Sequence, residues 1–450
     1  MPERANDVPG GNAAKDKSLP RDPVRALQWK LYRAAKQSRS RRFHALYDKV
    51  CRRDVLNRAW LEVARNGGAP GVDGVTIESI EATGVAGFLG QLQAELVEKR
   101  YRPLPVRRVS IPKRSGGQRH LGVPTVRDRV VQAATKMVLE PLYEADFTDL
   151  SFGFRPKRSA HQARERIRTG IWQGRRWVVD ADIKGFFDNL DHDRLVGMLW
   201  QRISDRGVLD LIRAWLGAGV LTGDGLLHPE VGTPQGGVIS PLLANVFLHH
   251  LDEVWQGQHR RLGELTRYAD DLVICCGTRD RAEAAMATLQ HLLTELGLEL
   301  AEAKTRLVNL HNPGEGFDFL GYHFRMVPTK RDPRRRFAAC WPSQAAVAAA
   351  RDRIRELTPP SRIGRPTIVV VEDVNRFLKG WGAYFRHGNS TQQFHQLDHF
   401  VFDRIARFIA RKHGSRNWRR GVADLAESRT RIGLYRLGGT IGYTSAHAPR

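Results

Sequence analysis

The chain has 450 residues, and its 72 Lys and Arg against 48 Asp and Glu give a net charge of +24 at neutral pH. Hydrophobic residues make up 41% of it, which excludes a disordered protein, and no apolar run reaches the about 20 residues that cross a bilayer or resembles a signal peptide. The four cysteines form no CxxC pair, so neither a disulfide scaffold nor a zinc knuckle is expected.

This charge predicts a nucleic-acid partner, because Lys and Arg side chains that neutralise phosphates release condensed counterions. The alternative is a basic enzyme whose charge serves only solubility. Cysteines without a disulfide pattern are typical of a reducing compartment. We therefore expect a cytoplasmic protein, associated with the nucleoid when it acts on DNA, with no membrane partner.

The N-terminal third is predicted to be mainly helical. Residues 1–20 are polar, contain Gly and Pro, and are expected to form a frayed tail. Apolar residues recur at helical spacing over about 24–64 and again over 84–101. Alternation over 106–112 predicts a strand, and Ser-Gly-Gly at 115–117 predicts the hairpin turn that follows it.

The middle of the chain is predicted to mix helices with strands. These elements are a helix over 127–147, a buried strand over 177–183, a helix opened by Ser240-Pro241, two short strands around a turn at Ala269-Asp270, a helix over 281–296 and a strand over 317–324.

The character of the chain changes after about residue 325. A loop at 330–336 holds five basic residues, and helices are predicted over 342–357, 371–387 and 394–412. Residues 301–450 hold 27 Lys and Arg against 12 Asp and Glu, a net charge of +15. We therefore predict a domain boundary near 325–340, followed by a basic helical domain.

Two adjacent aspartates at the predicted strand turn, Asp270 and Asp271, are the sharpest chemical signal. Nucleotidyl transfer uses two divalent cations about 4 Å apart, and Mg²⁺ prefers a few carboxylates together with substrate phosphates. Aspartates at a hairpin tip can bind such ions if a third carboxylate faces them from a neighbouring strand. A Tyr-x-Asp-Asp sequence alone also arises by chance, so the third carboxylate matters.

The strand over 177–183 supplies that third carboxylate. Strand alternation places Asp180 and Asp182 on the same face. We expect Asp182 to be the metal ligand because it lies at the end of the strand, where the chain turns. Asp188 and Asp191 are better explained as turn or helix-capping residues.

With these motifs in order, the sequence resembles the group II intron reverse transcriptase and maturase family over about residues 45–445. The likeness is carried by IPKRSGGQRHLGVPTVRDRVVQ (111–132), SFGFRPKRSAHQA (151–163), DADIKGFFDNLDH (180–192), GTPQGGVISPLLANVFLHHLD (232–252), RYADDLVI (267–274), LGLELAEAKT (296–305), FDFLGYHF (317–324) and VNRFLKGWGAYFRHG (374–388).

The resemblance implies an α+β fold of the right-hand polymerase type, with fingers, a palm built on an antiparallel sheet, and an all-helical thumb and maturase domain. The expected divisions are a disordered tail at 1–20, a basic helical extension at 21–66, fingers and palm at 67–330, and the thumb and maturase domain at 331–450. Because the chain ends without a CxxC pair, we expect no HNH endonuclease domain, so that the primer comes from another source.

The family's functional residues carry over by position. Asp182, Asp270 and Asp271 would be catalytic and would hold two Mg²⁺ ions, with a further oxygen from the Ile183 carbonyl. Phe187 would exclude a ribose 2′-hydroxyl, unless it only packs in the core. The remaining expected nucleotide and RNA contacts are Lys113 and Arg119 on the triphosphate, Gln235 near the nascent base pair, and Arg155 near template or nucleotide.

The basic C-terminal domain is expected to hold nucleic acid. Its RNA-facing residues are predicted to be Arg411, Lys412, Arg416, Arg419 and Arg420. Trp381, Tyr384 and Phe385 lie among basic residues and could stack on bases, but packing between the thumb helices is the favoured explanation.

The family implies an RNA-directed DNA polymerase and maturase that binds its intron RNA, assists splicing and copies that RNA into DNA. The expected partners are group II intron RNA, template RNA with a DNA primer, target DNA and dNTPs; the sequence does not specify an oligomeric state. Two alternatives stay open at this point. One is a domesticated reverse transcriptase in defence or repair, and the other is a non-enzymatic splicing cofactor.

Overall fold

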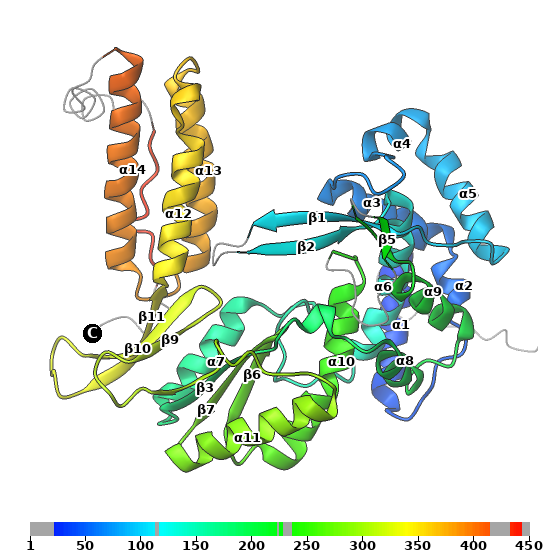
Figure 1. The fold of residues 1–450 in the computed structure, drawn as a ribbon, viewed down its shortest axis with the longest axis horizontal. Helices are drawn as coiled ribbons and strands as arrows, with labels where there is room; N and C mark the ends of the chain where they lie inside the picture. Colours follow the sequence, from blue (N-terminus) through cyan, green and yellow to red (C-terminus); the bar gives the residue numbers. More distant parts are fainter. Residues whose placement is uncertain (1–21, 113–116, 223–224, 228–235, 415–432, 443–450) are drawn as a thin grey trace, which may run out of the picture. The chain divides into compact units, whose positions relative to one another are not determined.

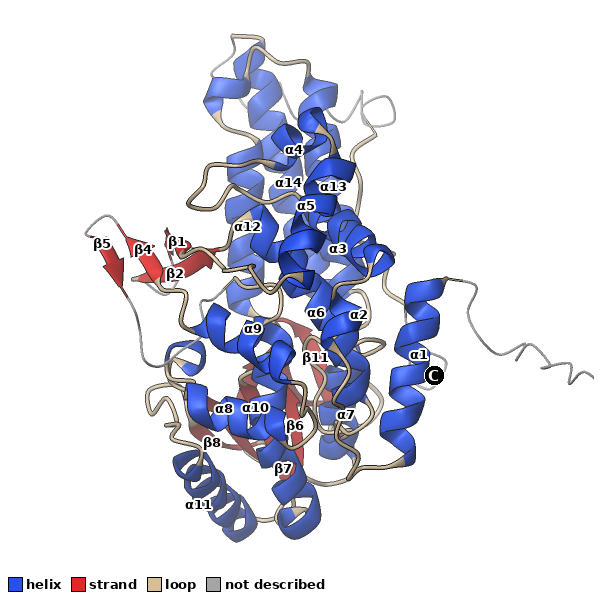
Figure 2. Ribbon diagram, turned by 90° about the vertical axis from the view of Figure 1, so that its right-hand side faces the viewer, coloured by secondary structure: helices blue, strands red, loops and turns tan. Residues whose placement is uncertain are grey.

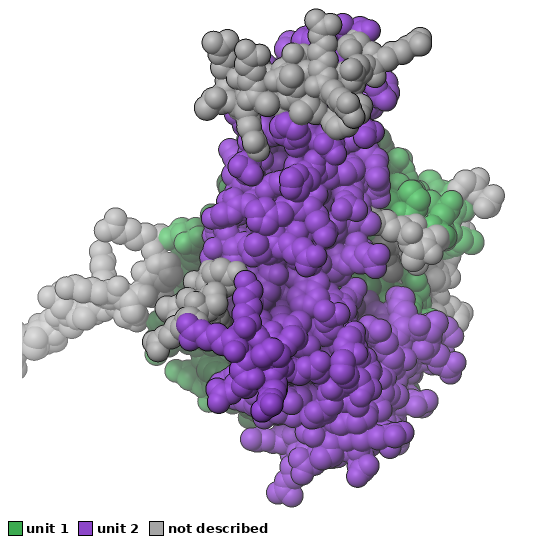
Figure 3. Space-filling model, turned by 90° about the vertical axis from the view of Figure 1, so that its left-hand side faces the viewer, with its two compact units in different colours: residues 1–147, 185–250 green, residues 148–184, 251–450 purple. Residues whose placement is uncertain are grey.

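The computed structural model describes residues 22–112, 117–222, 225–227, 236–414 and 433–442. The chain divides into two units, coloured separately in Figure 3. Unit 1 comprises residues 1–147 and 185–250, and unit 2 comprises residues 148–184 and 251–450. Most helices and strands of both units are labelled in Figure 1, and all are coloured by type in Figure 2.

Unit 1 is mainly helical and carries one small sheet. Its helices are α1 (Pro23–Gln37), α2 (Tyr47–Val50), α3 (Arg53–Asn66), α4 (Ile77–Thr83), α5 (Val85–Val97), α6 (Val126–Glu144), the 3₁₀ turn η1 (Phe186–Asp188), α8 (His192–Trp200), α9 (Arg206–Leu216) and most of α10 (Ser240–Val254). Its strands are β1 (Val106–Pro112), β2 (Gln118–Val123), β4 (Val220–Thr222) and β5 (Gly225–Leu227).

Helix α6 is the centre of unit 1. Most of its residues are buried, and α1, α2 and α3 pack against it. Its N-cap Thr125 accepts a hydrogen bond from the Asp128 amide, and the Asp128 carboxylate accepts one from the Tyr101 hydroxyl at 2.7 Å. Helix α6 also buries polar side chains, among them Asp128, Arg129 and Gln132, so hydrogen bonds such as that from Tyr101 are needed to satisfy them.

The sheet of unit 1 has the strand order β2-β1-β4-β5. Strands β1 and β2 form an antiparallel hairpin that begins with the pair Arg107 and Val123 and ends with Pro112 and Gln118. The predicted strand over 106–112 is therefore confirmed. Lys113 lies outside the described residues, as does the beginning of the predicted turn.

Among its described residues, unit 2 has two sheets and five long helices. Its elements are α7 (Ala160–Trp172), β3 (Trp177–Asp182), the π-helical turn η2 (Trp255–His259), β6 (Glu264–Tyr268), β7 (Asp271–Cys276), α11 (Arg279–Glu295), β8 (Arg306–Asn309), β9 (Gly316–Phe319), β10 (Tyr322–Pro328), β11 (Arg336–Pro342), α12 (Gln344–Leu357), the 3₁₀ turn η3 (Pro360–Arg362), α13 (Thr367–Phe385) and α14 (Thr391–Lys412).

The first sheet of unit 2 is antiparallel and has the order β6-β7-β3-β8. Helix α7 contacts β6 and β7, and α11 contacts β3 and β7. Val178 and Val273 share a buried cluster with Ile167 and Ile171 of α7. Successive side chains of a strand alternate between faces, so Asp180 and Asp182 follow Val178 on the face that α7 partly covers.

The second sheet, β11-β10-β9, connects to the helices α12, α13 and α14, which run side by side in Figure 1. The apolar cluster continues from Phe317 and Phe324 of this sheet through Val374 of α13 to Val401 of α14. The predicted mixed fold with an antiparallel palm sheet and a helical C-terminal region is confirmed. The predicted domain ranges stay predictions; residue 331 lies in the loop between β10 and β11.

Three details of the predicted secondary structure were wrong. The helical stretch over 24–64 is interrupted between Gln37 and Tyr47, where Arg202 donates hydrogen bonds to the carbonyls of Ser38, Arg39 and Arg41. The predicted strand over 317–324 is a hairpin, because Leu320 and Gly321 have positive φ angles of 50° and 77°. Several elements were not predicted at all: helices α4, α7 and α9 and strands β4, β5, β8 and β11.

Candidate active site

The sheet of unit 2 brings the predicted carboxylates together. In the antiparallel register of β3 and β7, Asp182 lies directly opposite Asp271. Opposite residues in such a pair have Cβ atoms about 5 Å apart and point to the same face. Asp180 lies two residues earlier, opposite Val273, on that same face. The register thus places Asp182 rather than Asp180 beside the Asp270–Asp271 pair.

Asp270 lies in a two-residue turn that joins β6 to β7 and is closed by the pair Tyr268 and Asp271. The other turn residue, Ala269, has a φ of 57°, in the left-handed region that residues with a Cβ rarely adopt. A positive φ at the first loop residue is typical of tight hairpins. The two adjacent aspartates are thus held at a sharp and strained reversal of the chain.

The loop that precedes α7 packs against this turn. A Cβ at Gly153 would lie 2.4 Å from the Ala269 nitrogen, so only glycine fits. The Arg155 guanidinium is buried and donates hydrogen bonds to the carbonyls of Thr148 and Ser151. Arg155 therefore shapes the loop beside the turn, and its predicted contact with RNA stays a prediction.

The electrostatics of the carboxylates favour a cation. The pKa of Asp271 is raised to about 7, first by burial and then by the negative charges of Asp270, Asp182 and Asp180. Burial also raises the pKa of Asp180, although its carboxylate accepts a hydrogen bond from Arg306 at 3.1 Å. A buried group of acids that repel one another is stabilised by any positive charge that approaches it.

Lys304 provides one such charge, and the sequence did not identify it. Its Nζ lies 2.5 Å from Oδ2 of Asp182, and this contact raises the pKa of Lys304. Lys304 lies in LGLELAEAKT, a segment used above only for its likeness to the family. A lysine just before strand β8, the neighbour of β3, is the signal that could have been noticed.

A cavity of about 420 Å³ opens beside these groups. It is lined by Asp180, Ala181, Asp182, Asp271, Ala303, Lys304, Arg306, Asp318, Phe319 and Leu320. Its polar wall therefore holds three of the clustered aspartates, together with two cations that pair with them. There is room here for ions and part of a charged substrate.

Among the described residues, no three His, Cys, Asp or Glu side chains surround one point as a ready metal cage. Lys304 pairs with an oxygen of Asp182 that a metal would need. The donor set nevertheless fits a divalent ion, because it consists of hard carboxylate oxygens whose mutual repulsion a cation relieves. Asp182, Asp270 and Asp271 are the residues that would hold it.

Ile183 continues β3 as an isolated bridge to Leu300. In this bridge the Asp182 carbonyl accepts from Ala301 and the Lys184 amide donates to Glu299, so the bridge does not use the carbonyl of Ile183 itself. The predicted role of that carbonyl as a metal ligand stays a prediction that this geometry allows.

The predicted nucleotide contacts belong to unit 1. Phe186 is buried and packs near Phe247, whereas Phe187 is half-buried with its ring 5.2 Å from that of Phe186. Core packing is thus the role of Phe186. Gln235 and the side chain of Arg119 lie outside the described residues, as Lys113 does.

The aromatic residues of the C-terminal helices pack inside the protein, as favoured from the sequence. The Trp381 ring lies 4.7 Å from Phe385 and 5.6 Å from Phe394, and the Tyr384 hydroxyl donates to the Leu320 carbonyl at 3.0 Å. Cys275 and Cys276 are likewise buried free thiols.

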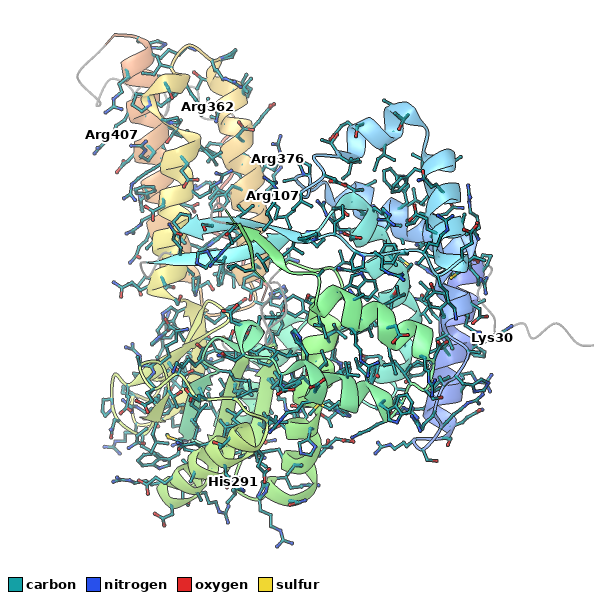
Figure 4. The ribbon with its side chains drawn as sticks, turned by 45° about the vertical axis from the view of Figure 1, so that its right-hand side comes forward. Lys30, Arg107, His291, Arg362, Arg376 and Arg407 are labelled. Carbon is teal, nitrogen blue, oxygen red and sulfur yellow. The ribbon has the colours of Figure 1, made fainter. Side chains whose placement is uncertain are left out.

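Basic residues lie on the outside of these helices. Arg362, Arg376 and Arg407 are labelled in Figure 4. Arg411 is exposed at the end of α14, and the neighbouring Lys412 donates a hydrogen bond to the Arg365 carbonyl at 2.5 Å. The predicted RNA-binding residues Arg416, Arg419 and Arg420 lie outside the described residues. No described helix is both long and apolar enough to span a membrane.

Comparison with known proteins gives two family matches. Residues 111–324 match the family "Reverse transcriptase (RNA-dependent DNA polymerase)", and residues 347–424 match "Group II intron, maturase-specific domain". Among solved structures, the partial Cas6-RT-Cas1–Cas2 complex is 26% identical, with a TM-score of 0.36, over 56% of this chain and 41% of that one.

Two curated relatives extend the match. Protein YkfC of Escherichia coli K12 is 36% identical over 291 residues, which cover 56% of this chain and 75% of YkfC. The group II intron-encoded protein LtrA of Lactococcus lactis subsp. cremoris is 37% identical over 232 residues, which cover 51% of this chain but only 38% of LtrA. The chain belongs to the group II intron reverse transcriptase and maturase family.

Proposed function

We propose that this protein is an RNA-directed DNA polymerase and maturase that copies a group II intron RNA into DNA. One observation carries the proposal: Asp182 lies directly opposite Asp271, next to the turn that holds Asp270. RNA binding alone requires no such cluster of acids, because carboxylates repel phosphates. A polymerase requires it to bring cations and the triphosphate together.

Asp182, Asp270 and Asp271 would hold two Mg²⁺ ions, with a further oxygen from Ile183. When bound, these ions activate a 3′-hydroxyl and neutralise the triphosphate. The chain's own contribution is to fix the three carboxylates on one sheet face, and to supply a local cation in Lys304 until the ions arrive. Binding of an ion by Asp182 would require Lys304 to release this carboxylate.

Four residues predicted from the family resemblance would select and orient the nucleotide. Lys113 and Arg119 carry charge suited to a triphosphate, and Gln235 would adjoin the nascent base pair. Phe187 would exclude the 2′-hydroxyl of a ribonucleotide. Its half-buried ring, beside a fully buried Phe186, leaves an aromatic surface for that purpose.

The maturase-specific region would bind intron RNA, template RNA with its DNA primer, and target DNA through phosphates. Its predicted contacts are Arg411 and Lys412 at the end of α14 and Arg416, Arg419 and Arg420 beyond it, and Arg155 of the reverse transcriptase region would contact template or nucleotide. A net charge of +15 over residues 301–450 supports binding that is mostly independent of sequence. We place this activity in the cytoplasm, close to the nucleoid.

Primer extension tests the proposal. The purified protein is given an RNA template, a DNA primer, dNTPs and Mg²⁺, and RNA affinity is measured in parallel by filter binding. We expect the unaltered protein to extend the primer, and Asp270→Asn to abolish extension without a change in RNA affinity. Asp280→Asn is the matched control, because Asp280 is an exposed carboxylate in the first turn of α11.

No extension by the unaltered protein would reject the polymerase and leave a non-enzymatic splicing cofactor. Extension without any preference for group II intron RNA, in an RNA-affinity comparison with an unrelated structured RNA, would instead favour the domesticated enzyme.

A further inference from the structure

A fully buried ion pair lies beneath the catalytic turn of unit 2. Arg267 of β6 and Asp252 near the end of α10 both have side chains with no exposed surface. The guanidinium Nε donates to Oδ1 of Asp252 at 2.8 Å, and Nη2 donates to Oδ2 at 2.5 Å. Burying two charges carries a desolvation cost that apolar residues of similar size would avoid. Stability alone therefore gives no reason for placing this pair here.

A third contact of Arg267 suggests the reason. Its remaining terminal nitrogen, Nη1, donates to the carbonyl of Ala269 at 3.0 Å. Ala269 is the residue with the left-handed φ of 57°, and the next two residues are the catalytic aspartates. A planar guanidinium with five donors can hold a carboxylate with one edge and a carbonyl with another, which a lysine cannot do.

Arg267 is itself fixed by the backbone. Its amide donates to the Leu150 carbonyl at 2.8 Å, and its carbonyl accepts from the Phe152 amide at 2.9 Å. The loop held by these bonds contains Gly153, whose missing side chain lets it approach the Ala269 nitrogen. The turn is thus contacted on its carbonyl by Arg267 and on its amide side by the loop.

We propose that Asp252 and Arg267 are positioning residues that hold the Ala269 carbonyl and thereby fix Asp270 and Asp271 in the geometry that binds metal. Asp252 orients the guanidinium, and the guanidinium restrains a turn that would otherwise leave its left-handed conformation. The inference deepens the proposed polymerase function and rests on it. Neither residue touches substrate or metal in this role.

The test removes the pair without leaving a buried charge. In Arg267→Met/Asp252→Leu both charges are replaced by apolar groups, which in other proteins preserves stability. Three quantities are measured: the unfolding midpoint, the affinity for Mn²⁺ by electron paramagnetic resonance, and kcat and KM for dTTP on poly(rA) with an oligo(dT) primer.

We expect the double variant to keep its unfolding midpoint and its KM within about threefold, while kcat falls about 100-fold. The Mn²⁺ dissociation constant should rise about tenfold, because the aspartates are no longer held together. Glu264→Gln is the matched control. Glu264 begins the same strand and pairs with Arg166 and Arg175, away from the turn, so kcat should not change.

A double variant with unchanged kcat and unchanged Mn²⁺ affinity would overturn the proposal, as would an equal loss in Glu264→Gln. If the double variant does not fold, the kcat of the single variant Arg267→Lys is measured instead. Adding Ala269→Gly to Arg267→Lys removes the steric cost of the positive φ and should restore at least tenfold of the lost kcat. Failure of this rescue would also overturn the proposal.

These results are separable from the polymerase proposal. If the unaltered protein fails to extend a primer, the Mn²⁺ measurement still reports whether the pair positions the aspartates. If the unaltered protein extends the primer and the double variant has unchanged kcat and Mn²⁺ affinity, the polymerase proposal is supported and the positioning role is rejected.

Discussion

Replacing Asp271 by asparagine should make the metal-free protein more stable at neutral pH while abolishing its activity. The pKa of Asp271 is about 7 in the folded protein, against an ordinary value of 3.8. The folded state therefore binds a proton between these pH values that the unfolded state has already released. The resulting stabilisation is complete below about pH 3.8 and is lost as pH rises through 7.

The magnitude follows from the size of this shift. A difference of roughly 3 pH units at 1.36 kcal/mol per unit corresponds to about 4 kcal/mol as an upper bound. Partial solvent access screens the site, so we expect about 2 kcal/mol. Asparagine has nearly the same shape as aspartate and never ionises. The free energy of unfolding of Asp271→Asn should therefore not fall by this amount as pH rises.

The assay is urea unfolding in EDTA from pH 4 to pH 8.5, for the unaltered protein and for Asp271→Asn. The difference between their free energies of unfolding isolates Asp271 from the other titrating groups. It should grow with pH up to about 7 and then stay constant. Asp280→Asn should follow the unaltered protein throughout. Parallel curves for the unaltered protein and Asp271→Asn would refute the reasoning.

Four further predictions concern the same groups and their neighbours. Mn²⁺ affinity, measured by electron paramagnetic resonance, should rise about tenfold per pH unit up to pH 7 and then level off, because the metal must displace the Asp271 proton; a flat profile would contradict this. Lys304→Met should tighten Mn²⁺ binding about three- to fivefold, the range for one exposed ion pair, and weaker binding would contradict the competing role of Lys304. Phe187→Ala should raise ribonucleotide incorporation relative to dNTPs about tenfold in single-nucleotide extension, whereas unchanged selectivity would assign the ring to packing. Arg411→Gln/Lys412→Gln should reduce the slope of log affinity against log salt by about 1.8 on duplex nucleic acid, and an unchanged slope would remove both residues from the binding surface.

Much of the active site followed from local sequence. The alternation of β3 places Asp180 and Asp182 on one face, and the Tyr-Ala-Asp-Asp sequence predicts a turn between two strands. Both signals involve residues only a few positions apart. Lys304 was missed because its relation to Asp182 depends on β8 pairing with β3 across more than a hundred residues.

The errors have similar causes. FDFLGYHF has the apolar content of one strand, but the positive φ angles of Leu320 and Gly321 reverse the chain and make it a hairpin. The interruption before α2 depends on Arg202, which is distant in the sequence. Its guanidinium donates hydrogen bonds to three backbone carbonyls in the segment between Gln37 and Tyr47.

By itself the sequence determined the family, and it predicted many of the helices and strands, a nucleic-acid partner from a charge of +24, and the three aspartates proposed to bind metal. These properties rest on composition, on periodicity and on motifs that are continuous in the chain. Only the tertiary structure showed the register that sets Asp182 opposite Asp271, the ion pair of Lys304 with Asp182, and the buried pair of Arg267 and Asp252 beside the turn. Strand register and buried ion pairs join residues distant in the chain, and no local pattern records which distant groups will meet.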